Sequence, residues 1–321
     1  MTFALILIGG VVRVSDSGLG CGPAGSGTHG WPLCGGRVLP FLQENQLIEF
    51  SHRVVATIVV LLIVALALIA FRRLRDHRWL VRGVVAAGVL VLIQAALGGL
   101  TVEHGLHTAL VAAHLGLAML LLGLLITLRR LAQGPERAAP IDSSRALRVS
   151  AGVATVLVLA TIVAGGYVAG TEEEGTPSEP VIGAHLACGT EFPSCLGDFM
   201  PFGTSRLVDI HLTHRLLMYL TTIAILAMTA IAVRRRAVLP PGGNRAFLLI
   251  PLLLACQILL GATNVWEGKH AGLIVGHLTL GTILWGTLVY AAASLMPAPA
   301  PAREPRSEGS GGRRETQPVT A

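Results

Sequence analysis

The sequence has few charged and few aromatic residues. Charged residues make up 13% of the 321 residues, whereas hydrophobic residues make up 53%, and the mean hydropathy is +0.69. A soluble domain needs more polar surface than this to cover its apolar mass, so an ordinary soluble protein is excluded. Aromatic residues make up only 5%, so no platform for stacking bases is evident and no nucleic-acid partner is expected. The composition predicts an integral membrane protein.

Long apolar runs predict the helices. Crossing about 30 Å of hydrocarbon takes about 20 helical residues. Met1 to Val14 is too short to span by itself, and it lacks the basic start and the cleavage site of a secretory signal. We interpret it as the end of a first helix that is short or truncated. The sequence therefore predicts an all-α protein with eight transmembrane helices, of which seven are complete: 49–71, 81–102, 107–129, 149–170, 209–233, 246–265 and 271–295.

The net charge of +6 comes from arginines in short clusters between apolar runs. By the positive-inside rule, the connections that carry them are cytoplasmic. The cysteine-bearing loops, 15–48 and 171–208, then face outward in a multi-pass protein of the cell membrane. The tail 297–321, rich in Pro, Gly, Ser and charge, is predicted to be disordered and cytoplasmic. The clustered arginines are Arg72, Arg73, Arg75, Arg78 and Arg82; Arg129, Arg130, Arg137, Arg145 and Arg148; Arg234, Arg235, Arg236 and Arg245; and Arg303, Arg306, Arg313 and Arg314.

The chain contains an internal repeat. Four crossings return the chain to the same side, so both copies have the same orientation. We predict two tandem four-helix bundles related by a pseudo-twofold axis, at 1–130 and 149–296, joined by a cytoplasmic linker at 131–148. The repeated features are Gly9-Gly10 with Gly165-Gly166, His52-Arg53 with His214-Arg215, Gln94 with Gln257, and His114 with His277.

Four of the five cysteines lie in the two outer loops. Outside the cytoplasm, nearby thiols are oxidised, which favours one disulfide within each loop, Cys21–Cys34 and Cys188–Cys195. Free thiols or a zinc site across the loops are the alternatives, although the spacing matches no standard zinc pattern. Cys256, inside an apolar helix, is interpreted as a small core residue.

Four repeat-related histidines share one depth. His52, His114, His214 and His277 lie three to seven residues inside helices that enter from the outer face, or roughly 5–10 Å below it at 1.5 Å per residue. Two imidazoles at one height in a bundle form a site for a haem iron. We predict one site per half, from His52 with His114 and from His214 with His277. A hydrogen bond to a neighbouring helix is the alternative for any one histidine, and we expect that role for Gln94 and Gln257.

Charged residues accompany these histidines. Arg53 and Arg215 are costly near lipid unless they pair with anions, which haem propionates supply, or extend to water. Glu49 lies one helical turn before His52, where it can accept a proton near a bound macrocycle, or simply favour the start of a helix. His211 occupies the matching position of the second half. The acid therefore predicts a reacting first half and a supporting second half.

Several motifs together carry a resemblance to one family. They are Gly9-Gly10-Val11-Val12-Arg13, Ser17-Gly18-Leu19-Gly20-Cys21, Trp31-Pro32-Leu33-Cys34, Glu49-Phe50-Ser51-His52-Arg53, His114, Cys188 with Phe192-Pro193-Ser194-Cys195, His214-Arg215 and His277. With them the chain resembles the haem A synthases of bacteria and mitochondria, over nearly all its length except the tail. It departs from the family in the short first helix and in a glycine-rich insertion, 22–30, inside the first cysteine pair.

The resemblance implies an eight-helix enzyme that oxidises the C8 methyl group of haem O to the formyl group of haem A. It implies that His52 and His114 ligate haem O or haem A, that His214 and His277 ligate a permanent haem B, and that Glu49 is the catalytic carboxylate. The implied partners are membrane lipid, a haem O-forming prenyltransferase and an electron donor or acceptor, with a homo-oligomer left open. Two other classes also fit the histidines: a bis-histidine di-haem electron-transfer cytochrome, and a haem carrier or assembly chaperone.

Overall fold

The computed structural model describes residues 1–39, 43–133, 145–173, 182–236, 239, 241–268 and 270–296. Within these ranges it has eight α-helices, and seven of them are long and apolar enough to cross a membrane, as the sequence predicted. α1 (Thr2–Val14) is the short one. The predicted disorder of 297–321, most of the linker 131–148, and Arg137 lie outside the described residues.

Each apolar run folds as one helix, and most helices extend past the run into polar residues. α6 begins at Arg206 because the Ser205 hydroxyl accepts a hydrogen bond from the backbone N–H of Val208 and so caps the first turn. The long helices are α2 (Glu44–Arg73), α3 (Arg78–Glu103), α4 (Thr108–Ala132), α5 (Arg145–Gly170), α6 (Arg206–Arg234), α7 (Pro241–Trp266) and α8 (Ala271–Ser294). A two-residue antiparallel pair, β1 (Glu172–Glu173) and β2 (Ile182–Gly183), follows α5.

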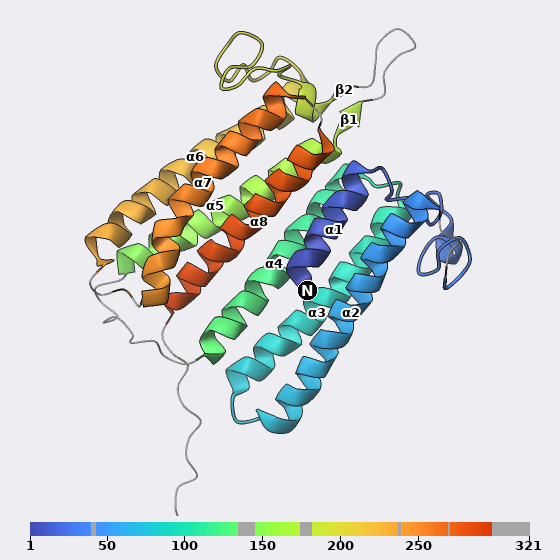
Figure 1. Cartoon of the computed structure of the whole chain (residues 1–321), viewed down its shortest axis with the longest axis horizontal. Coiled ribbons are helices and arrows are strands. Elements are labelled where there is room, and N and C mark those ends of the chain that lie inside the picture. The colour runs from blue at the N-terminus through green and yellow to red at the C-terminus, as the bar shows by residue number, and fades with distance from the viewer. Residues whose placement is uncertain are drawn as a thin grey trace, which may run out of the picture.

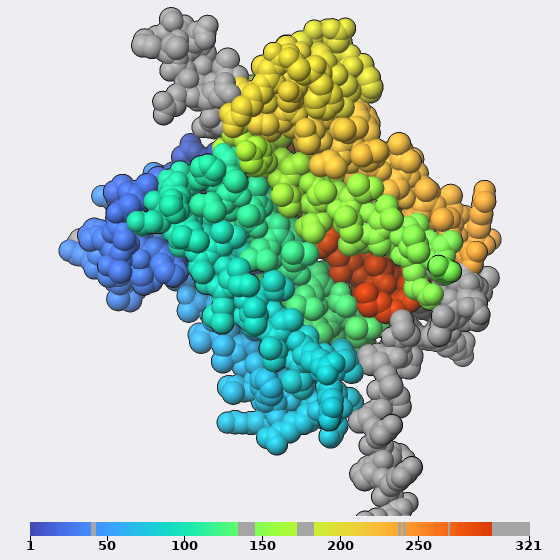
Figure 2. Space-filling view, turned by 180° about the vertical axis from the view of Figure 1, so that it is seen from behind, coloured from blue at the N-terminus to red at the C-terminus, as the bar shows by residue number. Residues whose placement is uncertain are grey.

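Sequence neighbours pack together, and the middle of the molecule is made by helices from both ends of the chain. Figure 1 shows α1 to α4 on one side and α5 to α8 on the other, with the loops that bear the cysteines at one common end. Contacts between the two groups join α4 to α5 and α8, and α1 to α8. Seen from behind in Figure 2, α5 lies beside α4, with part of α8 visible between them.

Two side chains lock α8 to α4 across this middle. The buried Trp285 indole donates a hydrogen bond to the carbonyl oxygen of Met119 at 2.9 Å. At the C-terminal ends of these two helices, the Arg130 guanidinium donates to the Ser294 hydroxyl at 3.1 Å and lies 6.0 Å from the Tyr290 ring centroid. Arg130 is buried, so this arginine, which the sequence placed in a basic connection, is part of the packing between helices.

The outward faces of the helices are apolar. A set of large aliphatic side chains on α2, α3, α6 and α7 is more than half exposed, which suits contact with lipid rather than water. The exposed Cys256 thiol is on α7, so the interpretation of this cysteine as a core residue is wrong. The chain is a multi-pass membrane protein. The exposed side chains are Leu61, Leu62, Leu92, Ile223, Leu226, Leu252 and Leu259.

Candidate functional site

Each of the four repeat-related histidines lies against a glycine of the preceding helix. A Cβ atom added to any of these glycines would come within 2.9–3.2 Å of the imidazole Cε1 atom, closer than an ordinary van der Waals contact. Only glycine leaves room for the ring at this approach. The same contact is made four times, so it belongs to the repeated design. The pairs are Gly9 with His52, Gly98 with His114, Gly165 with His214, and Gly261 with His277.

Two glutamines fix the helices at the level of these imidazoles. Gln94 on α3 donates a hydrogen bond to the carbonyl oxygen of His114 at 2.9 Å, and Gln257 on α7 donates to that of His277 at 3.1 Å. The prediction that both glutamines bond to a neighbouring helix is confirmed. They hold α3 to α4 and α7 to α8, the helix pairs that carry the second histidine of each half.

The four histidines differ in the hydrogen bonds of their Nδ1 atoms. His214 Nδ1 donates to the carbonyl oxygen of Thr161 at 3.0 Å. Nε2 therefore keeps the lone pair with which the imidazole can bind a metal. The buried Nδ1 atoms of His52, His114 and His277 have no hydrogen-bond partner among the described residues.

This donor set fits a haem iron better than a bare metal ion. A haem iron takes only two axial ligands from the protein, and each half carries two histidines that lie against glycines. A bare ion such as zinc takes three or four protein ligands. Within the part of the chain that the structure describes, no group of three or more His, Cys, Asp or Glu side chains could hold one.

Glu49 is buried, at 4% exposure, and both of its oxygens are engaged. Oε2 accepts a hydrogen bond from the backbone N–H of Cys21 at 2.8 Å. Oε1 forms an ion pair with the guanidinium of Arg53, one turn further along α2. The acid therefore faces the first cysteine-bearing loop and not lipid.

The guanidinium of Arg53 also reaches into that loop. It donates hydrogen bonds to the carbonyl oxygens of Gly30 and Leu33, at 2.7 and 2.8 Å, and both residues lie between the two cysteines of the loop. Arg53 thus joins the acid of α2 to the backbone inside the ring that Cys21 and Cys34 close.

Arg215 makes the equivalent contacts in the second half. It donates to the carbonyl oxygens of Glu191 and Ser194, both at 2.7 Å, and more weakly to that of Pro193 at 3.3 Å. Its guanidinium carbon lies 5.4 Å from the Phe192 ring centroid, within cation–π range. All four residues lie between the cysteines of the second loop, so each arginine holds one disulfide-closed ring.

Both loops contain a disulfide, Cys21–Cys34 and Cys188–Cys195, which are the pairings that the sequence favoured over free thiols or zinc. The glycine-rich insertion of the first loop folds back on itself: a Cβ atom on Gly22 would lie 2.8 Å from the Gly30 Cα atom. This close approach lets the longer loop close its bond.

The chain is similar to known proteins over most of its length. A family model described as cytochrome oxidase assembly protein, COX15-CtaA, matches residues 1–289. The chain belongs to this family. Among similar proteins, the heme A synthase of Shouchella clausii is 32% identical over 299 residues, 89% of this chain and 91% of that protein. The heme A synthase of Symbiobacterium thermophilum is 30% identical over 307 residues, 91% of each chain, and that of Alkalihalophilus pseudofirmus is 29% identical over 292 residues, 89% of this chain and 91% of that protein.

The two halves of this COX15-CtaA family member differ at the position of the acid. His211, which stands where the first half has Glu49, is buried at 5% exposure. Its Nδ1 donates to the carbonyl oxygen of Ala184, in the short 3-10 helix Ala184–Leu186, at 2.8 Å. Both residues therefore tie the start of a helix to the cysteine-bearing loop before it, but only Glu49 places a carboxylate there.

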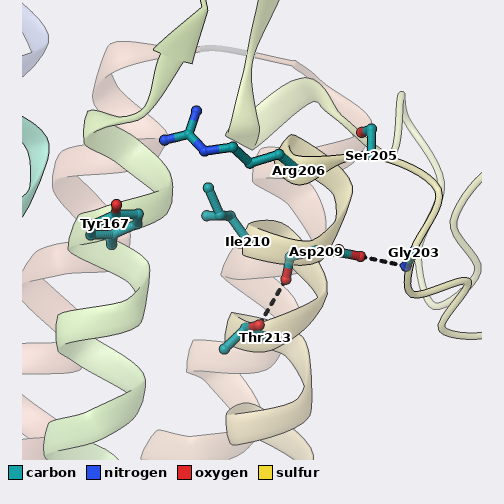
Figure 3. Close-up of a pocket in the computed structure, with 7 residues that line it drawn as sticks. All are labelled: Tyr167, Gly203, Ser205, Arg206, Asp209, Ile210 and Thr213. Atoms are coloured by element: carbon teal, nitrogen blue, oxygen red, sulfur yellow. Dashed lines mark hydrogen bonds between the residues drawn. The ribbon is translucent and has the colours of Figure 1, made fainter.

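A groove of about 470 Å³ lies between the end of α5 and the start of α6 in this family member. Figure 3 shows Arg206, Ile210 and Thr213 along α6, opposite Tyr167 of α5. Asp209 accepts a hydrogen bond from the backbone N–H of Gly203 at 2.7 Å, which fixes the loop at the rim. None of the four histidines lines this groove, so we do not assign it to the candidate site.

Sequence reasoning missed the glycines that support the imidazoles. The Gly-Gly pairs were recognised only as part of the repeat, because a glycine inside a helix does not show from sequence what it touches. The available clue was that Gly9 and Gly165, like His52 and His214, occur once per half at matched places.

Proposed function

We propose that the chain is a haem A synthase, an oxidoreductase that converts the C8 methyl group of haem O to the formyl group of haem A. The names of the relatives support this activity, and they match about nine tenths of each chain. The observation that carries the proposal is the contrast between the halves: both hold imidazoles against glycines, but among the described residues only the first half adds a buried acid, Glu49.

We assign the two haems to the two halves. In this proposal residues 1–130 and 149–296 form tandem, pseudo-twofold-related bundles. His52 and His114 hold haem O or its product, and His214 and His277 hold haem B. The repeated glycine and glutamine contacts support an equivalent site in each half. The Thr161 hydrogen bond supports a more tightly fixed ligand at His214, as a permanent cofactor requires.

The reaction needs a proton acceptor and a path for electrons. With water as the source of oxygen, turning a methyl into a formyl group releases four protons and four electrons. His214 and His277 would hold haem B, which would supply a redox-active iron when bound. Glu49 is the acceptor for protons in the first half, one helical turn before His52. Arg53 and the Cys21 N–H hold its two oxygens in place, so its position is set before substrate binds.

We also propose that Arg215 binds a haem propionate, but through only one of its nitrogen atoms. The Nη atoms of Arg215 are committed to loop carbonyls. Its Nε–H is buried and has no partner among the described residues, so it is the donor that a propionate of haem B would meet. The matching role of Arg53 toward haem O remains a prediction.

Replacing Arg215 by alanine should loosen the second loop. Hydrogen bonds from a charged donor contribute about 1.5–3 kcal/mol each, so losing even one should raise the population of the open loop about tenfold or more. We expect faster reduction of Cys188–Cys195 by dithiothreitol in the purified protein, followed by alkylation and mass spectrometry. Arg234→Ala, an exposed arginine at the far end of the same helix, is the control. An unchanged reduction rate in Arg215→Ala would contradict the anchoring role.

The orientation and partners belong to the same proposal. The arginine clusters support a cytoplasmic placement of the connections after α2, α4 and α6, and the disulfides support an outward placement of the cysteine loops. The haem O-forming prenyltransferase and an electron donor or acceptor are the partners that the reaction implies, and a homo-oligomer stays open.

Identifying the porphyrins in the purified protein tests the activity against its rivals. We expect haem O or haem A beside haem B when cells that make haem O express the chain and the pigments are separated by reversed-phase chromatography. Haem B alone would identify an electron-transfer cytochrome. Haem O that is never converted, in the presence of functional electron partners, would identify a carrier.

A further inference from the structure

Each Gly-Gly pair faces two ways. The first glycine of each pair, Gly9 or Gly165, lies against a histidine of its own half. The second glycine points to a helix of the other half. Gly10 on α1 lies against Leu278 on α8, and the equivalent residue on α5 makes the matching contact with α4. At both pairs, one half of the chain touches the imidazole region of the other half.

The contacts at the second glycines are too close for any side chain. A Cβ atom at Gly10 would lie 2.6 Å from Leu278 Cδ2, and one at Gly166 would lie 2.9 Å from Leu115 Cδ2. Real Cβ atoms do not approach carbon this closely, so the leucine or its helix would have to move. Both leucines pack against the main hydrophobic core, which restricts where they can go.

These leucines directly follow candidate axial ligands. Leu278 is the next residue after His277, and Leu115 is the next residue after His114. Because the packed core limits rotation of these side chains, a displacement of either leucine is passed in part to the backbone that carries the ligand. Gly10 of the first half therefore lies against the residue that follows His277 in the second half. Likewise, Gly166 of the second half lies against the residue that follows His114 in the first half.

We propose that Gly10 and Gly166 are positioning residues that set the axial histidine of the opposite half, so that each haem site is adjusted from the other half of the chain. This rests on the proposed function only in taking the histidines as iron ligands. The role requires the absence of a side chain at both positions. It differs from ordinary helix packing because it predicts which of the two haems responds.

The expected result is a crossed response. Gly10→Ala should change the haem held by His214 and His277 and leave the other haem as it was, whereas Gly166→Ala should change the haem held by His52 and His114. The orientation of axial imidazoles sets the spectrum and the potential of a bis-histidine haem. We expect about a threefold or larger change in the reduction equilibrium constant of the opposite haem, less than the roughly tenfold minimum seen for groups bonded directly to a metal ligand.

The measurement is a spectroelectrochemical titration of the purified protein with both haems bound, together with its electron paramagnetic resonance spectrum. Gly88→Ala on α3 and Gly152→Ala on α5 are matched controls, because no heavy atom lies within 4 Å of a Cβ atom at either position. Single axial-ligand variants, His114→Ala and His277→Ala, assign each signal to its half.

A rescue variant keeps the proposal testable if Gly10→Ala does not accumulate. Gly10→Ala combined with Leu278→Ala restores the space, so its haem potentials should lie closer to those of the unmodified protein than those of Leu278→Ala alone. A change in the haem of the same half, or no change in either haem, would overturn the proposal. Two haem B molecules in the unmodified protein would instead refute the synthase activity and leave the crossed response measurable.

Discussion

Replacing Glu49 by glutamine is expected to stop haem A formation while both haems stay bound. Glutamine keeps the length of the side chain, and its carbonyl oxygen can still accept the N–H of Cys21, so the loop contact survives. What is lost is the group that, in the proposed function, accepts protons as the methyl is oxidised. General-base groups contribute at least about a hundredfold to a rate. Haem A, measured by chromatography in cells whose only synthase is the variant, should fall by that factor.

Two further variants separate chemistry from structure. Glu44→Gln changes an exposed acid in the first turn of the same helix and should leave haem A formation unaffected. Glu49→Asp keeps a carboxylate on a shorter side chain and should retain part of the activity. If cells with Glu49→Gln as their only synthase make a normal amount of haem A, Glu49 has no catalytic role and serves only to hold the loop.

Replacing His277 by alanine is expected to remove haem B from the second half while haem O still binds in the first. In the proposed function the imidazole is one of the two axial ligands from the second half, so its loss should lower the haem B content of the purified protein to about a tenth or less. The content is measured by the pyridine haemochrome assay after chromatography. His114→Ala is the mirror variant, which should lose haem O or haem A and keep haem B.

His270→Ala controls for a general effect of removing an imidazole near the start of α8. His270 is exposed and stands at the N-terminal end of this helix, so its variant should keep both haems. A His277→Ala protein with unchanged haem B would show that the haems had been assigned to the wrong halves.

The helices were predictable from sequence because each depends on one uninterrupted apolar run. The residues at which they begin and end were harder to predict. α2 begins at Glu44, five residues before the predicted start, because a polar turn at the membrane surface can continue a helix without being apolar. Arg130 shows the same limit: its place in a basic cluster indicated a connection, and the structure uses it to join α4 to α8.

From the sequence, the site could be predicted only where a residue type or a repeated position marked it. The histidines and Glu49 stand out because charged or titratable groups are rare in apolar runs. The contacts of Arg53 and Arg215 could not be predicted, since their carbonyl partners lie about twenty residues away in loops of different length. Glycines such as Gly98 carry no chemical mark at all, and their role appears only when the facing helix is in place.

The hydrogen bond from the Cys21 amide to Glu49 means that the first cysteine-bearing loop also orients the acid. A chain synthesised without the Cys21–Cys34 bond would still seat its imidazoles, since their glycine supports lie within the helices. The Glu49 carboxylate, however, would accept its Cys21 hydrogen bond from a backbone segment that no disulfide restrains. Formation of the disulfide during maturation of the protein would then control the orientation of the Glu49 side chain, independently of haem binding.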